Sequence, residues 1–164
     1  MVSTLLDRLF AHEKMDGDGR CPTYLYRWTL FQPRWPARWW NGFGIYLHQF
    51  VGDDWSLDVH DHPKRFISIG LVGEYIESVA DPHTRDWKTG HEDHVHRKYR
   101  APWVRTFPAT HAHRITLPDH GRPCWTLCIV LRHEREWGFW NKGRWIFWKR
   151  YVRSASANER RSCL

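Results

Sequence analysis

Alternating apolar and polar residues fill most of the chain from Tyr24 onward. Successive side chains of a strand point to opposite sides of a sheet, so such alternation is typical of half-buried β-strands. The pattern predicts strands over residues 24–31, 44–51, 57–61, 66–71, 74–79, 95–99, 104–107, 113–117 and 125–131. A last hairpin is expected from strands 136–140 and 145–151, joined by a three-residue turn at 141–143 in which Gly143 supplies a positive φ.

The two ends of the chain have a different pattern. Residues 3–13 predict a short helix capped by Ser3 or Thr4, and the last eleven residues are polar with few apolar positions. We therefore expect an N-terminal helix and loop over 1–22, a β-barrel over 23–153 and a flexible basic tail over 154–164. Ten or so short strands separated by turn signals predict an all-β fold, either a sandwich or a barrel of antiparallel sheets.

Composition is compatible with one domain built around a single core. The chain has 164 residues, of which 41% are hydrophobic and 12 are Trp. No apolar run is long enough to cross a bilayer, and the first ten residues lack the basic start and apolar stretch of a secretory signal. The four cysteines show no Cys-x-x-Cys spacing. We expect a cytoplasmic protein without a membrane partner.

Charge makes an anionic partner worth considering. The net charge is +7, and nine Lys or Arg against three Glu lie between Arg132 and Arg161. The segment 137–151 interleaves aromatic residues with cations, a mixture that nucleic-acid binders use for stacking on bases and contacting phosphates. Alternation in a hairpin favours another interpretation, in which the rings pack on the barrel and the cations reach water. A homodimer interface is a third interpretation.

Two His-x-His pairs among the 12 histidines carry the strongest chemical signal. His60 and His62 lie in Asp58-Val-His-Asp-His-Pro63, and His111 and His113 lie further along the chain. On strands, each pair presents both imidazoles to one side, and two such strands could bring the pairs together. Imidazole suits one divalent metal of the set Fe, Zn, Ni, Mn or Co. Asp58 and Glu77 are candidates either to anchor an imidazole or to bind the metal directly.

The motifs around these pairs resemble those of the cupin superfamily. The matching pieces are His60-Asp-His62 followed by Leu71-Val-Gly-Glu-Tyr75, and Pro108-Ala-Thr-His-Ala-His-Arg-Ile115. The wider sequence resembles a group of bacterial and phage cupins that has no established reaction. The resemblance implies a jelly-roll barrel, also called a double-stranded β-helix, with His60, His62 and His113 as metal ligands.

The sequence departs from the cupin pattern at one position of the first motif. The usual Glu a few residues after His-x-His is absent, and Arg65-Phe66 stands there instead. A site with three histidines and no Glu resembles the thiol dioxygenases of the superfamily. His111, Asp58 or Glu77 is an alternative fourth ligand. Many cupins have lost their metal and only bind ligands.

These features predict a metal-binding cupin that is a metal-dependent enzyme, oxygenase-like in preference to an isomerase or lyase, acting on a small polar or anionic molecule. Glu77 and Tyr75 share a strand face and are expected to transfer protons. Arg65, Asp58 and His48 are expected to contact the substrate. The alternatives are a cupin that binds a small ligand or nucleotide without turnover, and a nucleic-acid interaction protein that uses the basic, Trp-rich C-terminal segment.

Overall fold

A computed structural model describes residues 2–15, 22–33, 42–80 and 94–154 of the chain. The expected loop before residue 22 and the expected tail after residue 154 therefore lie almost entirely outside the described residues. Within them, neither helix has the length or the apolar character that crossing a bilayer requires.

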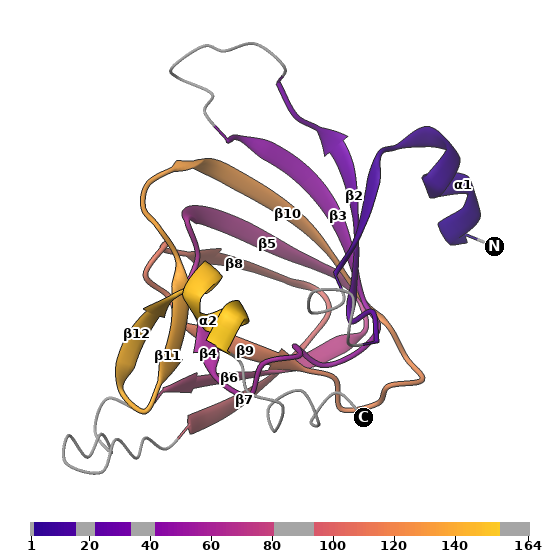
Figure 1. Cartoon of the computed structure of the whole chain (residues 1–164). Helices are drawn as coiled ribbons and strands as arrows, with labels where there is room; N and C mark the ends of the chain where they lie inside the picture. Colours follow the sequence, from indigo (N-terminus) through magenta and orange to yellow (C-terminus); the bar gives the residue numbers. More distant parts are fainter. Residues whose placement is uncertain (1, 16–21, 34–41, 81–93, 155–164) are drawn as a thin grey trace.

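Strands account for most of the described chain, with one short helix near each end (Figure 1). The elements are α1 (Val2–Leu9), β1 (His12–Met15), β2 (Leu25–Phe31), β3 (Gly44–Phe50), β4 (Val59–His60), β5 (Lys64–Val72), β6 (Glu74–Ala80), β7 (His94–Arg100), β8 (Trp103–Phe107), β9 (His113–Thr116), β10 (Cys124–His133), β11 (Gly138–Asn141), β12 (Arg144–Phe147) and α2 (Trp148–Ser154).

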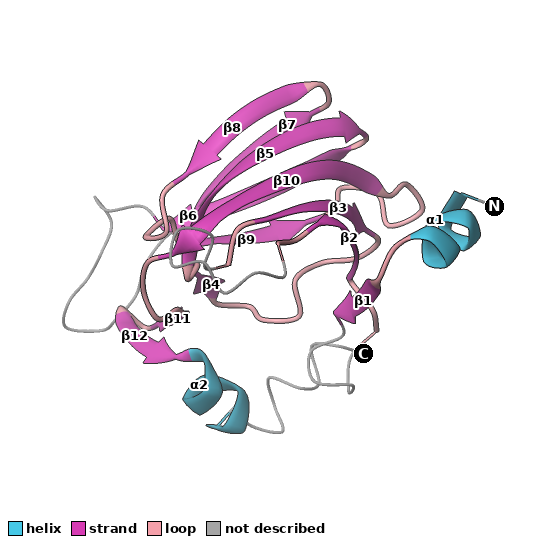
Figure 2. Ribbon diagram, turned by 90° about the horizontal axis from the view of Figure 1, so that it is seen from above, coloured by secondary structure: helices cyan, strands magenta, loops and turns pink. Residues whose placement is uncertain are grey.

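The strands form two six-stranded antiparallel sheets. One sheet has the order β1-β2-β3-β10-β5-β8 and the other has the order β12-β11-β4-β9-β6-β7. Of strands β3 to β10, the first sheet holds β3, β10, β5 and β8 and the second holds β4, β9, β6 and β7, which is the eight-strand order of a jelly roll. The all-β jelly-roll prediction is therefore confirmed. Figure 2 shows both helices outside the sheets.

Alternation along the strands decides which side chains face the interior. In β10, Cys124, Thr126 and Cys128 are buried. Across the sheet, Thr126 is the register partner of His48 and Cys128 that of Tyr46. Register partners in an antiparallel pair share a face of the sheet, so polar and apolar side chains line the interior in parallel rows.

Helix α1 covers part of the outer face of the first sheet. Trp28 of β2 points outward yet is fully buried, because it stacks on Trp125 and donates its indole N–H to Asp7 of α1 at 2.8 Å. The expected N-terminal helix is present, but it ends at Leu9. Residues 12–15 form β1 and pair with β2, so the N-terminal part joins the sheet and is not a separate appendage.

The C-terminal hairpin is shorter than the sequence predicts. Its turn consists of two residues, Lys142 and Gly143, both at positive φ (48° and 72°), between the paired residues Asn141 and Arg144. This is the geometry that the twist of a hairpin favours, and glycine is the residue that adopts it without strain.

The second half of the expected strand 145–151 is wrong, because residues 148–154 form α2. Trp148 and Tyr151 lie three residues apart, the spacing of one helical face. Trp148 stacks on Trp137 with ring centroids 5.5 Å apart, and Tyr151 stacks on Phe139 at 4.0 Å. The expected strand treats these aromatic residues as alternation, but Trp148 and Tyr151 contact Trp137 and Phe139 from one face of a helix.

Candidate metal centre

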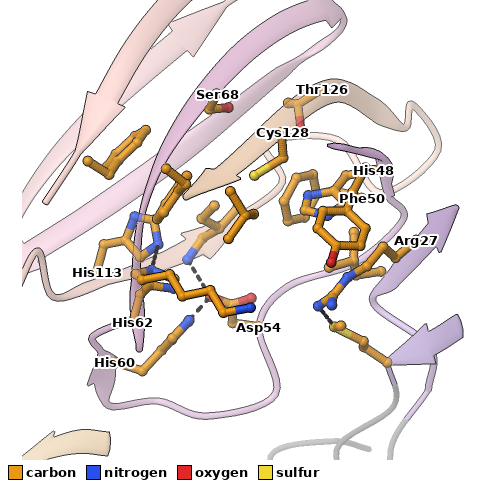
Figure 3. Close-up of a pocket in the computed structure, with 18 of the residues that line it drawn as sticks. Arg27, His48, Phe50, Asp54, His60, His62, Ser68, His113, Thr126 and Cys128 are labelled. Atoms are coloured by element: carbon orange, nitrogen blue, oxygen red, sulfur yellow. Dashed lines mark hydrogen bonds and ion pairs between the residues drawn. The ribbon is translucent and has the colours of Figure 1, made fainter. Parts of the chain in front are cut away.

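A cavity of about 410 Å³ lies between the two sheets, and Figure 3 shows the side chains around it. Its walls combine apolar residues such as Phe50, Phe66 and Ile115 with a small number of polar groups. Concave, largely apolar sites with a few placed polar groups are where proteins commonly bind small molecules.

Three of the histidines that the sequence singles out meet at one end of this cavity. His60 of β4 is the register partner of His113 of β9, and His62 follows two residues after His60. The ring centroids of His62 and His113 lie 4.9 Å apart, and those of His60 lie 5.2 Å from His62 and 5.5 Å from His113. One nitrogen from each ring lies within 4.8 Å of the other two. The expected convergence of His60, His62 and His113 is therefore what the structure shows.

The imidazoles of His60 and His62 are in the neutral form that binds metals. Burial lowers the pKa of His60 to about 4, and burial together with the neighbouring histidines holds the pKa of His62 well below its ordinary value. Both rings are neutral at pH 7, so each keeps a lone pair on one nitrogen. Nε2 of His62 and Nε2 of His113 face each other at 2.9 Å. Two nitrogens bound at about 2.1 Å to one ion lie roughly 3 Å apart, so the donor set fits a divalent metal.

Glu77 of β6 fixes the orientation of His113 from behind. Its Oε1 lies 2.7 Å from Nδ1 of His113 and 2.9 Å from Nε2 of His111. Burial raises the pKa of Glu77, but hydrogen bonds from both histidines and from Arg105 outweigh burial, so this pKa lies well below its ordinary value. The charged carboxylate can only accept, so His113 donates Nδ1–H and presents the lone pair of Nε2 to the cavity.

Arg105 of β8 is a functional residue that the sequence reasoning missed. It donates to Oε2 of Glu77 at 2.6 Å and to the hydroxyl of Tyr75 at 2.9 Å. A detectable signal existed, because Trp103, Arg105 and Phe107 alternate along one short strand and therefore share a face. An arginine between two inward-facing aromatic residues is itself expected to face inward, where it needs a buried anion as its partner.

His111 is next to one member of the three-histidine cluster, His113, with ring centroids 5.1 Å apart. It belongs to the loop between β8 and β9 and contacts Glu77, not His60 or His62. Glu77, His111 and His113 form a second group of potential ligand atoms, which shares His113 with the first. Glu77 already accepts hydrogen bonds from both histidines and from Arg105, so we interpret this group as the support of the first.

The remaining predicted site residues divide into two sets. Tyr75 and His48 line the cavity, as expected. Asp58 does not, because β4 is only two residues long and the strand alternation does not extend back to it. Instead Asp58 accepts hydrogen bonds from Asn141 at 2.8 Å and from Tyr151 at 2.7 Å. Arg65 also points away from the cavity, with 58% of its side chain exposed and an ion pair to Glu134 at 3.4 Å.

Asp54, and not Asp58, places a carboxylate beside an imidazole of the cluster. It is buried at the cavity wall, accepts the backbone N–H of Ile115 at 2.8 Å, and lies 3.8 Å from Nδ1 of His60. Lys64 also lines the cavity and donates to the carbonyl of Gly42 at 2.8 Å. Lys64 directly follows the His60-Asp-His62-Pro63 motif, whereas Asp54 lies outside the motifs, so only the folded chain reveals the position of Asp54.

Comparisons with known proteins give relatives in structure only. No model of a known protein family matches the chain, and no curated protein sequence does either. Among solved structures, a cupin superfamily protein from Desulfitobacterium hafniense has 17% identity and a TM-score of 0.44, over 66% of this chain and 77% of the other. An oxalate decarboxylase–formate complex from Lactobacillus farciminis has 13% identity and a TM-score of 0.49, over 76% of this chain and 31% of the other.

The strand order identifies the fold independently of these similarity scores. Strands β3-β10-β5-β8 face strands β4-β9-β6-β7, and the His-x-His motif and the second histidine motif meet where β4 pairs with β9. Cupins are jelly rolls of this kind. The chain therefore has the jelly-roll fold that cupins share with other proteins, and His60, His62 and His113 of its two histidine motifs line the cavity between the sheets.

Proposed function

We propose that this protein is a metal-dependent enzyme that binds one divalent ion through His60, His62 and His113 and acts on a small anionic molecule. The observation that carries the proposal is the convergence of three imidazoles at one end of a cavity. Three protein ligands leave further coordination positions of an ion open, as catalytic metal sites require.

A bound metal of the set Fe, Zn, Ni, Mn or Co supplies Lewis-acid polarisation of an oxygen group and, where it is redox-active, dioxygen activation. Three neutral imidazoles leave the charge of the ion uncompensated, which favours an anionic ligand in the open positions. The absence of a carboxylate among these ligands is the reason to prefer oxygenase chemistry to isomerase or lyase chemistry.

Tyr75 is the residue that we assign to hydrogen bonding with the substrate. It lines the cavity, and burial raises the pKa of its hydroxyl far above the ordinary value, so the group stays protonated. Arg105 donates to its oxygen, which leaves the phenolic O–H free to point elsewhere. Glu77, for which proton transfer was expected, is instead a positioning residue, since His111, His113 and Arg105 all bind its carboxylate.

Metal analysis tests the proposal directly. The full chain is purified without added metal, reloaded separately with Zn²⁺ and Mn²⁺, and compared with the His60→Ala/His113→Ala variant by elemental mass spectrometry. We expect close to one ion per wild-type chain and at least a tenfold loss in the variant. The matched control is His120→Ala/His133→Ala, which removes two exposed histidines and should keep the metal. Absence of metal from the reloaded wild-type protein would contradict the proposal.

The nucleic-acid interpretation of the C-terminal segment has less support. Trp137 and Phe139 stack on Trp148 and Tyr151 of α2, so these rings are occupied within the protein. Binding of oligonucleotides therefore stays a prediction of the basic charge alone. Its test is salt-dependent oligonucleotide binding that is lost in the Lys149→Gln/Arg150→Gln variant.

A further inference from the structure

Two buried nitrogen atoms lie at the end of the cavity away from the three histidines. They are Nε of Arg27 and Nε2 of His48, and neither has a hydrogen-bond partner among the described residues. Figure 3 shows Arg27 and His48 on one side of the cavity, with His60, His62 and His113 on the other. Buried polar atoms are normally satisfied, so two such atoms beside one cavity indicate a missing ligand.

The fold places these two side chains next to each other by register. Arg27 of β2 and His48 of β3 are directly paired in the antiparallel ladder, so both point to the interior. His48 is in turn paired with Thr126 of β10, which is fully buried. The result is a polar row across the inner face of a sheet whose neighbouring interior residues are largely apolar.

The charge of Arg27 is weakly compensated. Among the described residues, its carboxylate partner is Glu13 at 3.6 Å, which is 64% exposed, and exposed pairs of this kind contribute little. Its Nη2 contacts the sulfur of Met15 at 3.3 Å, and a thioether is only a weak acceptor. The guanidinium also lies 5.3 Å from the centre of the Tyr46 ring. None of these contacts is a hydrogen bond to a charged oxygen, which a guanidinium at a cavity wall normally forms.

His48 is a neutral partner of Arg27. Burial, reinforced by the neighbouring Arg27, lowers the pKa of His48 to about 3, so the ring carries no charge at pH 7. The pair therefore offers about one positive charge and two N–H groups when the His48 proton is on Nε2. A carboxylate has one negative charge and two oxygens and matches this pair in both charge and number of hydrogen bonds.

We propose that Arg27 and His48 form a carboxylate subsite, and that the substrate is an elongated organic acid held at both ends of the cavity. One end is an oxygen group facing His60, His62 and His113, and the other is a carboxylate bound by Arg27. The apolar wall between the ends, which includes Phe50 and Ile115, selects a hydrocarbon spacer. This subsite rests on the proposed metal site for the first end only, since the Arg27 end uses no metal.

Calorimetric titration of straight-chain dicarboxylates tests the two-ended arrangement. The metal-loaded full chain is titrated with malonate, succinate, glutarate and adipate, and with the monocarboxylate of each length. We expect one dicarboxylate to bind at least tenfold more tightly than its monocarboxylate. In Arg27→Gln the dicarboxylate should bind less than twofold more tightly than its monocarboxylate, while the metal content stays unchanged. Arg97→Gln, which removes an exposed cation on β7, is the matched control and should keep the ratio.

A second titration separates failure of the subsite from failure of the metal site. Butyrate is added to metal-free protein while the His48 ring resonances are followed by NMR. We expect a saturable shift in the wild type and in Arg97→Gln, and none in Arg27→Gln. If the wild-type protein binds no metal but still shows the butyrate shift, the proposed function is overturned and the carboxylate subsite stands. Equal dicarboxylate and monocarboxylate affinities, or a butyrate response that survives in Arg27→Gln, would overturn the subsite.

Discussion

At the scale of single residues, His113 has the most constrained position in the site. Its Nδ1 lies 2.7 Å from Glu77 and its Nε2 lies 2.9 Å from Nε2 of His62. The carboxylate therefore determines which nitrogen carries the proton, and the other nitrogen is left to bind a cation. Arg105 keeps the carboxylate charged, at an N–O distance of 2.6 Å. The proposed metal ligand His113 thus lies on β9 and its anchor Glu77 lies on β6. Arg105, the counter-charge of that anchor, lies on β8.

Glu77→Gln tests this dependence. The substitution keeps the volume of the side chain but removes the charge that holds the Nδ1 proton of His113. We expect metal affinity to fall about 10- to 100-fold, the usual effect of removing such an anchor. Affinity is measured by competition with a chelator at pH 7.5. The matched control is Glu134→Gln, whose partner Arg65 lies outside the cavity and whose affinity should equal that of the wild type. Equal affinities in both variants would count against an anchoring role for Glu77.

At the scale of elements, α2 stabilises the segment that leads into β4. The hydroxyl of Tyr151 donates to Asp58 at 2.7 Å and lies 2.9 Å from Ser56, while its ring stacks on Phe139. Phe139 is also the register partner of His60. A helix outside the sheets therefore supports β4, a strand of only two residues that carries the proposed ligand His60.

Tyr151→Phe removes the hydroxyl and keeps the ring. Asp58 and Ser56 then lose a partner, and we expect the free energy of unfolding to fall by about 1–3 kcal/mol. Urea denaturation followed by Trp fluorescence measures the change. Lys149→Gln on the exposed side of the same helix should change stability by less than about 0.5 kcal/mol. If Tyr151→Phe is as stable as the wild type, the hydroxyl contacts do not stabilise the fold.

The sequence predicts the elements that have a local pattern of apolar and polar residues. It misses those whose structure depends on contacts with residues elsewhere in the chain. Strands β2, β3, β6 and β10 were predicted within about two residues because their alternation is long. The first half of helix α2 is expected as strand from the sequence, because the rings that select a helix, Trp137 and Phe139, lie outside the helix itself. The histidine cluster is predicted from motif spacing. Asp54 is not, since no local pattern shows that this aspartate faces the cavity. Arg105 is missed although its alternation with Trp103 and Phe107 is visible in the sequence.

At the scale of the whole molecule, the jelly roll brings together groups that lie far apart in the sequence. The pairing of β4 with β9 places residues 60 and 113 side by side, and the pairing of β2 with β3 places Arg27 beside His48 at the other end of the same cavity. Both ends lie on the inner faces of the two sheets. The interior thus combines the proposed metal-binding end with a cationic end inside a largely apolar wall.

The buried, neutral His48 gives the stability of the metal-free protein a defined pH dependence. In the unfolded chain this histidine takes up a proton near pH 6.5, whereas in the folded protein its pKa is about 3. Between these values the unfolded state binds more protons, so stability falls as pH is lowered from 6.5 toward 3. The contribution of one histidine is roughly 1 kcal/mol per pH unit.

Urea unfolding of metal-free protein between pH 7 and pH 4.5 measures this slope. We expect His48→Gln to lose stability less steeply than the wild type as pH falls. His133→Gln, which replaces an exposed histidine, should follow the wild-type slope. Parallel slopes for His48→Gln and the wild type would contradict a neutral His48 in the folded protein.

The most direct test of the metal centre is X-ray diffraction from crystals of the metal-loaded full chain at the absorption edge of the metal. The account predicts one anomalous peak in the cavity, at about 2.0–2.3 Å from a nitrogen of each of His60, His62 and His113. A peak on the Glu77–His111 side of His113, a peak elsewhere in the protein, or no peak at all would contradict it.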